Sequence, residues 1–487
     1  MSASPQSIAR AKGVFIDNAW REARTGRTIP VFAPAEGKVF AEIAAGGAAD
    51  IDAAVTAARR AVDGSWGKLT ATERGRILAK IGTLILDKAD ELTLIEARDT
   101  GKPMKQARAD IIACARYFEY YGAAADKVHG DTIPFMDGFF VATVYEPHGV
   151  TAHIIPWNYP AQMFGRSVAP ALAMGNAAVV KPAEDACMSV LRLVEIAAEA
   201  GLPTGALNVV PGLGEEAGAA LSAHPDIDFI SFTGSPEVGT LVQTAAAKNH
   251  IGCTLELGGK SAQVVFSDAD LQAAVPVLVA AIIQNAGQTC SAGARALIHK
   301  PIYDRVAGLL ADRFAQLQCG TPEMDLDLGP VVSATQKARV ERFLQKSDAD
   351  GIPVLARGQI AAGAPADGYY VRPTVYGPVP RSHTLACDEV FGPVLALMPF
   401  DDEADAIRLA NATPYGLVGG VWSGDGNRAM RVAKKIRAGQ LFINGYGAGG
   451  GIELPFGGFK KSGHGREKGF EALYEFGATK TIVLKHG

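Results

Sequence analysis

Two short segments of the chain hold a carboxylate and a thiol, each beside glycine residues. The first is Glu256-Leu-Gly-Gly-Lys260, the second is Asn285-Ala-Gly-Gln-Thr-Cys290, and an apolar helical run, Leu271 to Ile283, lies between them. A thiolate is a strong nucleophile, and a nearby carboxylate can accept a proton from the thiol or from a water molecule that later attacks a thioester. Glycine lets backbone or substrate come close. The pair suggests covalent catalysis followed by hydrolysis.

This pair needs support from the rest of the chain, because a single cysteine is more often a small buried filler than a nucleophile. The six cysteines form no Cys-x-x-Cys pair and no His-Cys cluster with the spacing of zinc ligands. We therefore expect reduced thiols and no metal site. The cysteines other than Cys290 are Cys114, Cys187, Cys253, Cys319 and Cys387.

Composition is that of a globular protein. A chain of 487 residues exceeds what one core usually serves, so we expect two or three domains. The hydrophobic content of 48% and the charged content of 20% argue against disorder. With a net charge of −4 and basic residues spread along the chain, we expect no nucleic-acid partner and no membrane partner. No signal-peptide pattern begins the chain and no apolar run approaches ~20 residues, which favours a cytoplasmic location.

The order of the expected elements indicates an α/β fold. Helical patterns cover residues 50–62 and 108–121. A further helix is expected to begin at Thr70, where Glu73 three residues later completes a capping box. From Gly149 onward, strand and helix alternate, which is typical of a parallel sheet covered on both faces, with ligands at the carboxyl ends of the strands. The expected strands are 150–155, 177–181, 207–210, 229–232 and 254–257, and the expected helices between them include 188–199 and 236–247.

A β-hairpin is predicted over residues 130–144, because Asp137-Gly138 is a turn signal between alternating residues. The run from Thr479 to Leu484 is another short β-like segment. The hairpin is either an arm that reaches a partner subunit or a simple edge hairpin. Pairing of the two segments is a hypothesis for dimer formation.

Two glycine-rich loops compete for a nucleotide. The segment 212–218 almost matches the dinucleotide fingerprint but has one residue too many. The segment 232–239 follows a strand directly and opens a helix, whose free N–H groups could hold a pyrophosphate. Thr240 stands where a P-loop would have its lysine, which disfavours an ATPase. Lys181-Pro-Ala-Glu184 is either an exposed turn with a surface ion pair or a clamp for a nucleotide ribose.

Together, seven motifs resemble the non-acylating, NAD(P)-dependent aldehyde dehydrogenase family, in that family's order and over nearly the whole chain. They are Ile155-Pro-Trp-Asn-Tyr-Pro160, Lys181-Pro-Ala-Glu184, Phe232-Thr-Gly-Ser235, Glu256-Leu-Gly-Gly-Lys260, Gly287-Gln-Thr-Cys290, Glu389-Val-Phe-Gly-Pro393 and Pro455-Phe-Gly-Gly458. The resemblance implies a Rossmann-like parallel-sheet cofactor domain (1–125 and 148–256), an α/β catalytic domain (257–460) and a small β bridging element (126–147 and 470–487). It also implies a homodimer or homotetramer.

The resemblance assigns roles residue by residue. Cys290 is similar to the nucleophile and Glu256 to the general base, while Asn158 and the backbone N–H of Cys290 would form the oxyanion hole. The hemithioacetal would give a hydride to NAD, and Glu256 would activate water to hydrolyse the thioester. Glu184 would repel a ribose 2′-phosphate, so NAD is expected over NADP. Residues similar to cofactor contacts are Ile155, Trp157, Lys181, Glu184, Gly234, Ser235, Glu389 and Phe391.

The expected substrate pocket departs from that of relatives acting on small aliphatic aldehydes. Tyr159 and Phe456 match two of four usual aromatic residues, while Arg166 and Gly450 stand at the other two places. A wider and more polar pocket is expected. Arg166 resembles an arginine that binds the distal carboxylate in semialdehyde dehydrogenases, and the run Arg166 to Pro170 also occurs in relatives acting on benzaldehyde. The arginine could instead be held by a neighbouring acid and never touch substrate.

The sequence therefore leaves three alternative functions to compare. The first is NAD-dependent oxidation of an aldehyde, aromatic or carboxylate-bearing, to its acid, with a small aliphatic or amino aldehyde as the alternative substrate. The second is a thiol hydrolase without a redox cofactor, which would leave the two nucleotide motifs without purpose. The third is a catalytically idle binding protein, which the presence of Asn158, Glu256 and Cys290 disfavours. His153 is expected in the core, and His464 in an exposed loop.

Overall fold

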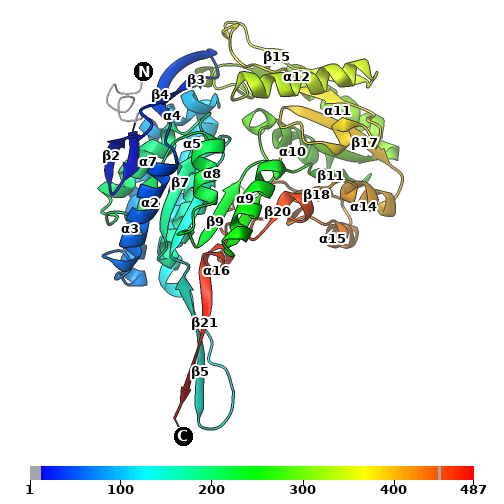
Figure 1. The fold of residues 1–487 in the computed structure, drawn as a ribbon. Coiled ribbons are helices and arrows are strands. Elements are labelled where there is room, and N and C mark those ends of the chain that lie inside the picture. Colours follow the sequence, from blue (N-terminus) through cyan, green and yellow to red (C-terminus); the bar gives the residue numbers. More distant parts are fainter. Residues whose placement is uncertain (1–12, 448–450, 487) are drawn as a thin grey trace.

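The computed structural model describes residues 13–447 and 451–486, which form two large sheets with flanking helices and one projecting hairpin (Figure 1). Parallel strands dominate both sheets, and the expectation of an α/β fold is confirmed. No helix in these described ranges is both long enough and apolar enough to cross a membrane.

The first sheet holds the predicted strand and helix repeats. Strands β6 to β10 run parallel, and each predicted strand is present within one or two residues of its expected bounds. The strand order is β2 (Ala19–Glu22), β1 (Gly13–Ile16), β8 (Leu207–Val209), β7 (Ala177–Pro182), β6 (Val150–Ile155), β9 (Phe229–Thr233), β10 (Gly252–Glu256) and β20 (Gly463–His464).

Most helices around this sheet follow their sequence signals, but α4, α6 and α8 were not among the expected helices. Thr70 caps α3 and exchanges hydrogen bonds with Glu73, which confirms the capping box. In α6, every residue except Gln162 is buried. The helices are α2 (Ala48–Asp63), α3 (Ala71–Asp87), α4 (Ala89–Thr100), α5 (Met104–Ala124), α6 (Pro160–Met174), α7 (Met188–Glu199), α8 (Ala219–Ser222) and α9 (Pro236–Lys248).

The second sheet follows directly from the first. Glu256 ends β10 of the first sheet, and Ala262 begins β11 of the second, so residues 257–261 carry the chain across. The order is β14 (Val354–Arg357), β16 (Thr374–Tyr376), β17 (Val394–Phe400), β12 (Arg295–His299), β11 (Ala262–Val265), β18 (Val418–Trp422) and β19 (Gln440–Ile443). Its helices are α10 (Leu271–Ile283), with the predicted bounds, α11 (Tyr303–Gln316), α12 (Ala334–Ala349), α14 (Glu403–Asn411) and α15 (Gly426–Lys435).

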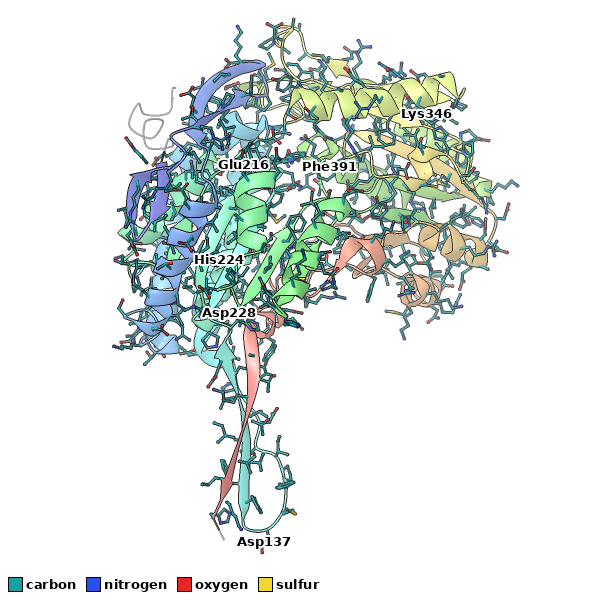
Figure 2. The ribbon with its side chains drawn as sticks, in the orientation of Figure 1. Asp137, Glu216, His224, Asp228, Lys346 and Phe391 are labelled. Atoms are coloured by element: carbon teal, nitrogen blue, oxygen red, sulfur yellow. The ribbon has the colours of Figure 1, made fainter. Side chains whose placement is uncertain are left out.

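The projecting element, called the hairpin from here on, is a two-stranded sheet made of the two β segments that the sequence suggested. β5 (Phe139–Pro147) pairs antiparallel with β21 (Gly477–Lys485) along its whole length, within one chain. Asp137 lies at the tip, where the chain turns back towards a single bridge between Thr132 and Ala142 (Figure 2). The main partner of β5 is therefore the C-terminal strand and not the segment before the turn.

Candidate active site

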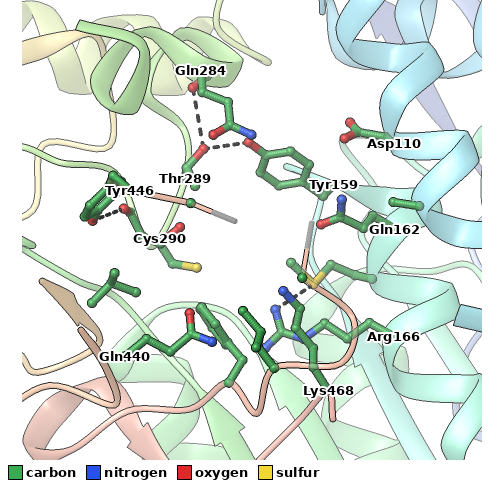
Figure 3. A pocket seen from close by; sticks show the side chains of 18 of the residues that line it. Asp110, Tyr159, Gln162, Arg166, Gln284, Thr289, Cys290, Gln440, Tyr446 and Lys468 are labelled. Atoms are coloured by element: carbon green, nitrogen blue, oxygen red, sulfur yellow. Dashed lines mark hydrogen bonds between the residues drawn. The ribbon is translucent and has the colours of Figure 1, made fainter. Parts of the chain in front are cut away.

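Two cavities meet at Cys290. One, of about 340 Å³, is lined by residues of the cofactor motifs, including Trp157, Gly234 and Glu389. The other, of about 370 Å³, is lined by Tyr159, Arg166 and other residues of α5, α6 and the second sheet, and Figure 3 shows it from close by. Cys290 is common to both linings, so its thiol lies where a cofactor and a substrate could meet.

The loop before Cys290 has an unusual backbone. Asn285, Ala286 and Gly287 all have φ between 49° and 76°, a left-handed region that residues with a Cβ seldom adopt. The amide of Asn285 donates to the carbonyl oxygens of Asn158 (2.7 Å) and Gln288 (3.3 Å), and Val332 donates its N–H to the Gln288 side chain (2.9 Å). These bonds fix the conformation that turns the chain from α10 towards the cavities.

Two glycines let this loop approach the carboxylate segment. A Cβ on Gly259 would lie 2.2 Å from the backbone oxygen of Cys290, and a Cβ on Gly258 would lie 2.4 Å from Oε2 of Glu389. The N–H of Gly259 also donates to Oε1 of Glu389 over 2.7 Å. The flanking glycines therefore allow the close approach that the sequence led us to expect.

The predicted catalytic residues come together at this crossing. Glu256, Asn158 and Cys290 line one cavity, and the Nδ2 group of Asn158 donates to the Gln288 carbonyl over 3.0 Å. Burial raises the pKa of the Cys290 thiol to about 12, although Arg166 acts to lower it. Burial also raises the pKa of Glu256 well above its usual value, again against the effect of Arg166. Each of the two groups therefore keeps its proton, and stays neutral, up to a higher pH than it would in water.

Arg166 connects Glu256 to an acid that was not predicted from the sequence. Its guanidinium forms ion pairs with Glu256 (3.5 Å) and with Glu467, and all three side chains are nearly inaccessible. The Ser231 hydroxyl donates a hydrogen bond to Glu467 over 3.1 Å. It is also hydrogen-bonded to the Ser167 hydroxyl, so the buried network of hydrogen bonds extends to α6. No local pattern marks Glu467, since its partner lies far away in sequence.

The first cavity contains most of the residues predicted as cofactor contacts. Trp157 packs edge-on against Phe391, with ring centroids 5.4 Å apart, and burial raises the pKa of Glu389 to about 7. Gln336 and Arg339 were not predicted; they donate to the carbonyl oxygens of Phe391 (2.7 Å) and Glu389 (2.8 Å). The predicted residues in this lining are Trp157, Gly234, Ser235, Glu389 and Phe391.

The other predicted cofactor residues lie outside this lining, at the ends of neighbouring strands. Ile155 ends β6 beside Pro182 of β7, and Lys181 pairs with Glu184 over 2.5 Å. The N–H of Gly214 donates to Glu184 over 3.1 Å, which brings the weaker glycine loop to the same place. Burial raises the pKa of Glu184, but the positive charge of Lys181 and the hydrogen bonds from Lys181 and Gly214 together outweigh it, so the pKa is lowered.

The second cavity is lined by Tyr159, Arg166 and Phe456, the three residues predicted as substrate contacts, with further polar groups around them. The Tyr159 hydroxyl is 2.7 Å from that of Thr289, and the ammonium of Lys102 lies 4.2 Å from the centre of the Tyr159 ring. Gly450 lies outside the described residues. His153 is buried, as expected, and His464 is exposed. Within the described ranges, no group of three or more His, Cys, Asp or Glu side chains could hold a metal ion.

Comparisons with known proteins identify the family. A model of the aldehyde dehydrogenase family matches residues 20–482. A crystal structure of a putative aldehyde dehydrogenase from Burkholderia cenocepacia is 60% identical, with a TM-score of 0.97 over 98% of this chain and 100% of that one. The NAD⁺ complex of an aldehyde dehydrogenase from Bacillus cereus is 37% identical, with a TM-score of 0.96 over 99% of both chains.

A mitochondrial benzaldehyde dehydrogenase from Antirrhinum majus is 40% identical over 483 residues, which is 98% of this chain and 90% of its own. This chain belongs to the aldehyde dehydrogenase family. It is an oxidoreductase that acts on aldehydes, and its fold is one that binds a nicotinamide dinucleotide.

The glycine at position 259 provides a direct test of this geometry. Gly259→Ala would push a methyl group against the Cys290 backbone, and a displacement of about 1 Å can cost roughly 100-fold in rate, so we expect a loss of that order in kcat. Gly308→Ala is the control, because this exposed helical glycine has nothing within 4 Å of an added Cβ. It should keep full activity and gain up to about 1 kcal/mol in stability. Full activity of Gly259→Ala would contradict the close approach.

Proposed function

We propose that this enzyme oxidises an aldehyde to its carboxylic acid with NAD, by covalent catalysis at Cys290. One observation carries the proposal: Cys290 is shared by the two cavities, beside Glu256 and Asn158. A hydrolase without a redox cofactor would need only one of the two cavities. An idle binding protein would have no use for a strained loop that places a thiol between them.

Cys290 is the nucleophile in this proposal. Its thiol is neutral at rest and gives its proton to solvent as sulfur adds to the aldehyde carbon. The aldehyde oxygen becomes negatively charged. The Asn158 amide, which donates to Gln288 in the loop that carries Cys290, and the Cys290 backbone N–H stabilise that charge.

The residues at the first cavity fit the cofactor. Gly234 and Gly258 have no side chain, so their backbone is accessible in this cavity. The rings of Trp157 and Phe391 line one wall, and the Glu389 carboxylate can accept hydrogen bonds from a ribose. Bound NAD supplies the hydride acceptor that turns the hemithioacetal on Cys290 into a thioester. Glu184 would hold the hydroxyls of the second ribose and repel a 2′-phosphate, which favours NAD over NADP.

Glu256 then acts on water. Neither of its oxygens accepts a hydrogen bond from the described residues; Oε2 forms the ion pair with Arg166, so Oε1 is available to a water molecule at the thioester. Removal of a proton from that water lets it attack the thioester carbon, which releases the acid and restores the thiol. Arg166 positions Glu256 through their ion pair, while its second acid, Glu467, keeps the cation balanced.

The substrate class in this proposal is an aromatic or carboxylate-bearing aldehyde. The cavity of about 370 Å³ is polar on one side and has the rings of Tyr159 and Phe456 in its walls. Its volume suits a substituted ring, and the similarity to a benzaldehyde dehydrogenase agrees with an aromatic substrate. A small aliphatic aldehyde would leave much of this space empty, and a cationic amino aldehyde would face Arg166.

A second copy of the chain is the proposed partner of the hairpin. In the segment before β5 and along β21, apolar side chains are exposed on the part of the chain that projects from the body, including Phe135 (61%), Val483 (56%) and Leu484 (57%). Such a patch on an extended β segment marks a surface that another chain covers. A homodimer or homotetramer would bury it.

Replacement of Glu256 separates hydride transfer from hydrolysis of the thioester. Glu256→Gln should still produce one equivalent of NADH rapidly, while steady-state turnover falls by roughly 100-fold or more because the thioester accumulates. Stopped-flow absorbance of NADH measures both phases. Cys290→Ala is the control and should produce no NADH in either phase. Unchanged steady-state turnover of Glu256→Gln would refute the role of Glu256 in hydrolysis.

Glu184 controls the choice of cofactor in this proposal. Glu184→Gln keeps the shape but removes the charge that opposes a 2′-phosphate, so the ratio of kcat/KM for NAD to that for NADP should fall by about tenfold. Steady-state kinetics with both cofactors measure this ratio. An unchanged ratio would show that residues other than Glu184 discriminate between NAD and NADP.

The hairpin surface is tested by a single charge. Val483→Glu would put a carboxylate into an apolar interface, so the mass measured by light scattering should fall below that of the unmodified enzyme. Leu309→Glu, at an exposed apolar position on α11, is the control and should not change the mass. The same mass for both variants would remove the hairpin from the subunit interface.

A further inference from the structure

One side chain of α6 faces the second cavity without a partner in the protein. Every residue of α6 except Gln162 is buried, and Gln162 belongs to the lining of this cavity. Figure 3 shows its amide pointing into the cavity, across from the thiol of Cys290. Among the described residues, none forms a hydrogen bond with this amide. Its N–H groups and its oxygen are therefore available to whatever occupies the cavity.

Packing gives no reason for a glutamine at this position. An amide that serves only the fold is paired with another polar group of the protein. Gln440, in the same lining, is such a residue, because its Nε2 group donates to the carbonyl oxygen of Pro455 over 2.7 Å. Gln162 differs, since its amide is turned towards the space where a ligand enters, as polar groups that orient a ligand are.

The wall that α5 contributes offers space and a second hydrogen-bond acceptor. Ala109 and Ala113 lie one turn apart on α5 and both line the cavity with short side chains. Asp110 lies in the same lining; its Oδ2 accepts from the ammonium of Lys102 over 2.6 Å, and its Oδ1 accepts no hydrogen bond from the described residues. Burial raises the pKa of Asp110 to about 6, against the effect of Lys102, so at pH 7 this group is mostly an acceptor.

The charges around the cavity give a carboxylate no advantage. Glu256 and Glu467 pair with the guanidinium of Arg166, and burial makes these ion pairs costly to exchange for a substrate. The negative charges of the same two acids also act on Lys468. Asp110 adds a negative charge within the lining itself. Of the proposed substrates, these charges favour an aromatic aldehyde whose polar substituent is neutral.

We infer that Gln162 is a specificity-determining residue that binds a hydroxyl group of the substrate, so that hydroxyl-bearing aromatic aldehydes are preferred over aldehydes of the same shape without the hydroxyl. This inference rests on the proposed oxidation and names a group that its substrate carries. A hydroxyl group suits the site because it can accept from the amide N–H of Gln162 and donate to the oxygen of Gln162 or to Asp110. The aldehyde carbon would lie at Cys290, with the ring between the two ends.

A matched pair of ligands isolates the hydroxyl. 4-(Hydroxymethyl)benzaldehyde and 4-ethylbenzaldehyde share the ring and the aldehyde, have nearly the same shape and carry no charge; their meta isomers form a second pair. Dissociation constants are measured at pH 7 by calorimetry with Cys290→Ala protein and NAD, so that no covalent adduct forms. We expect the alcohol of at least one pair to bind about fivefold more tightly than its ethyl counterpart, the effect expected of one hydrogen bond.

Gln162→Leu in the same background should bring the ratio of alcohol to ethyl binding close to one. Gln162→Met, which keeps an unbranched side chain without an amide, is the second variant and should do the same. The control Gln316→Leu, at an exposed position at the end of α11, should keep the full ratio, and so should Gln284→Leu, at an exposed position of the same cavity lining.

Three results would overturn the inference. The first is equal binding of alcohol and ethyl compound by the parent protein in both pairs. The second is a ratio that survives the loss of the Gln162 amide in whichever of the two variants folds. The third is tighter binding of 4-carboxybenzaldehyde than of the alcohol, which would show that the cavity selects a charge and not a hydroxyl.

Turnover of the same pairs by the unmodified enzyme tests the oxidation separately. Selective binding through Gln162 without reduction of NAD would refute the proposed function and leave the hydroxyl site standing. Oxidation of both members of a pair, at a ratio of kcat/KM that Gln162→Leu does not change, would refute the hydroxyl site and leave the proposed function standing.

Discussion

The site depends on the place where the chain crosses from one sheet to the other. Residues 257–261 join β10 to β11, and two successive glycines there let the Cys290 loop and Glu389 approach within van der Waals distance of the backbone. Because any Cβ would collide at these positions, the crossing fixes Glu256, at the end of β10, close to the loop that carries Cys290. The two cavities are the spaces left on either side of this contact.

Burial gives the site its electrostatic character. Taking a thiol and a carboxylate out of water raises the pKa of both, so burial favours the neutral form of each. Arg166 opposes this effect for both groups and is itself held by Glu467. The protein thus keeps Glu256, Cys290 and a cation close together at low exposure, where interactions between charges are stronger than in water.

Local signals in the sequence predicted much of the fold. The capping box at Thr70, the apolar run of α10 and the alternation of strand and helix each depend on neighbours in the chain, and each was found. Helix α6, which is buried along almost its whole length, was not among the expected helices. The pairing of Arg166 with Glu467 could not be predicted, since it joins residues far apart in sequence that only the folded chain brings together. Motif spacing indicated Cys290 and Glu256, but not the buried acid that shares Arg166 with Glu256.

Acyl transfer to Cys290 is the central claim, and it is most directly tested by mass spectrometry. The enzyme would be mixed with NAD and an aromatic aldehyde, quenched in acid during turnover and digested, and the peptide that contains Cys290 would be weighed. The account predicts that this peptide gains the mass of the acyl group, and that the gain is absent without NAD. Reduction of NAD with no acyl group on Cys290 at any time during the reaction would contradict it.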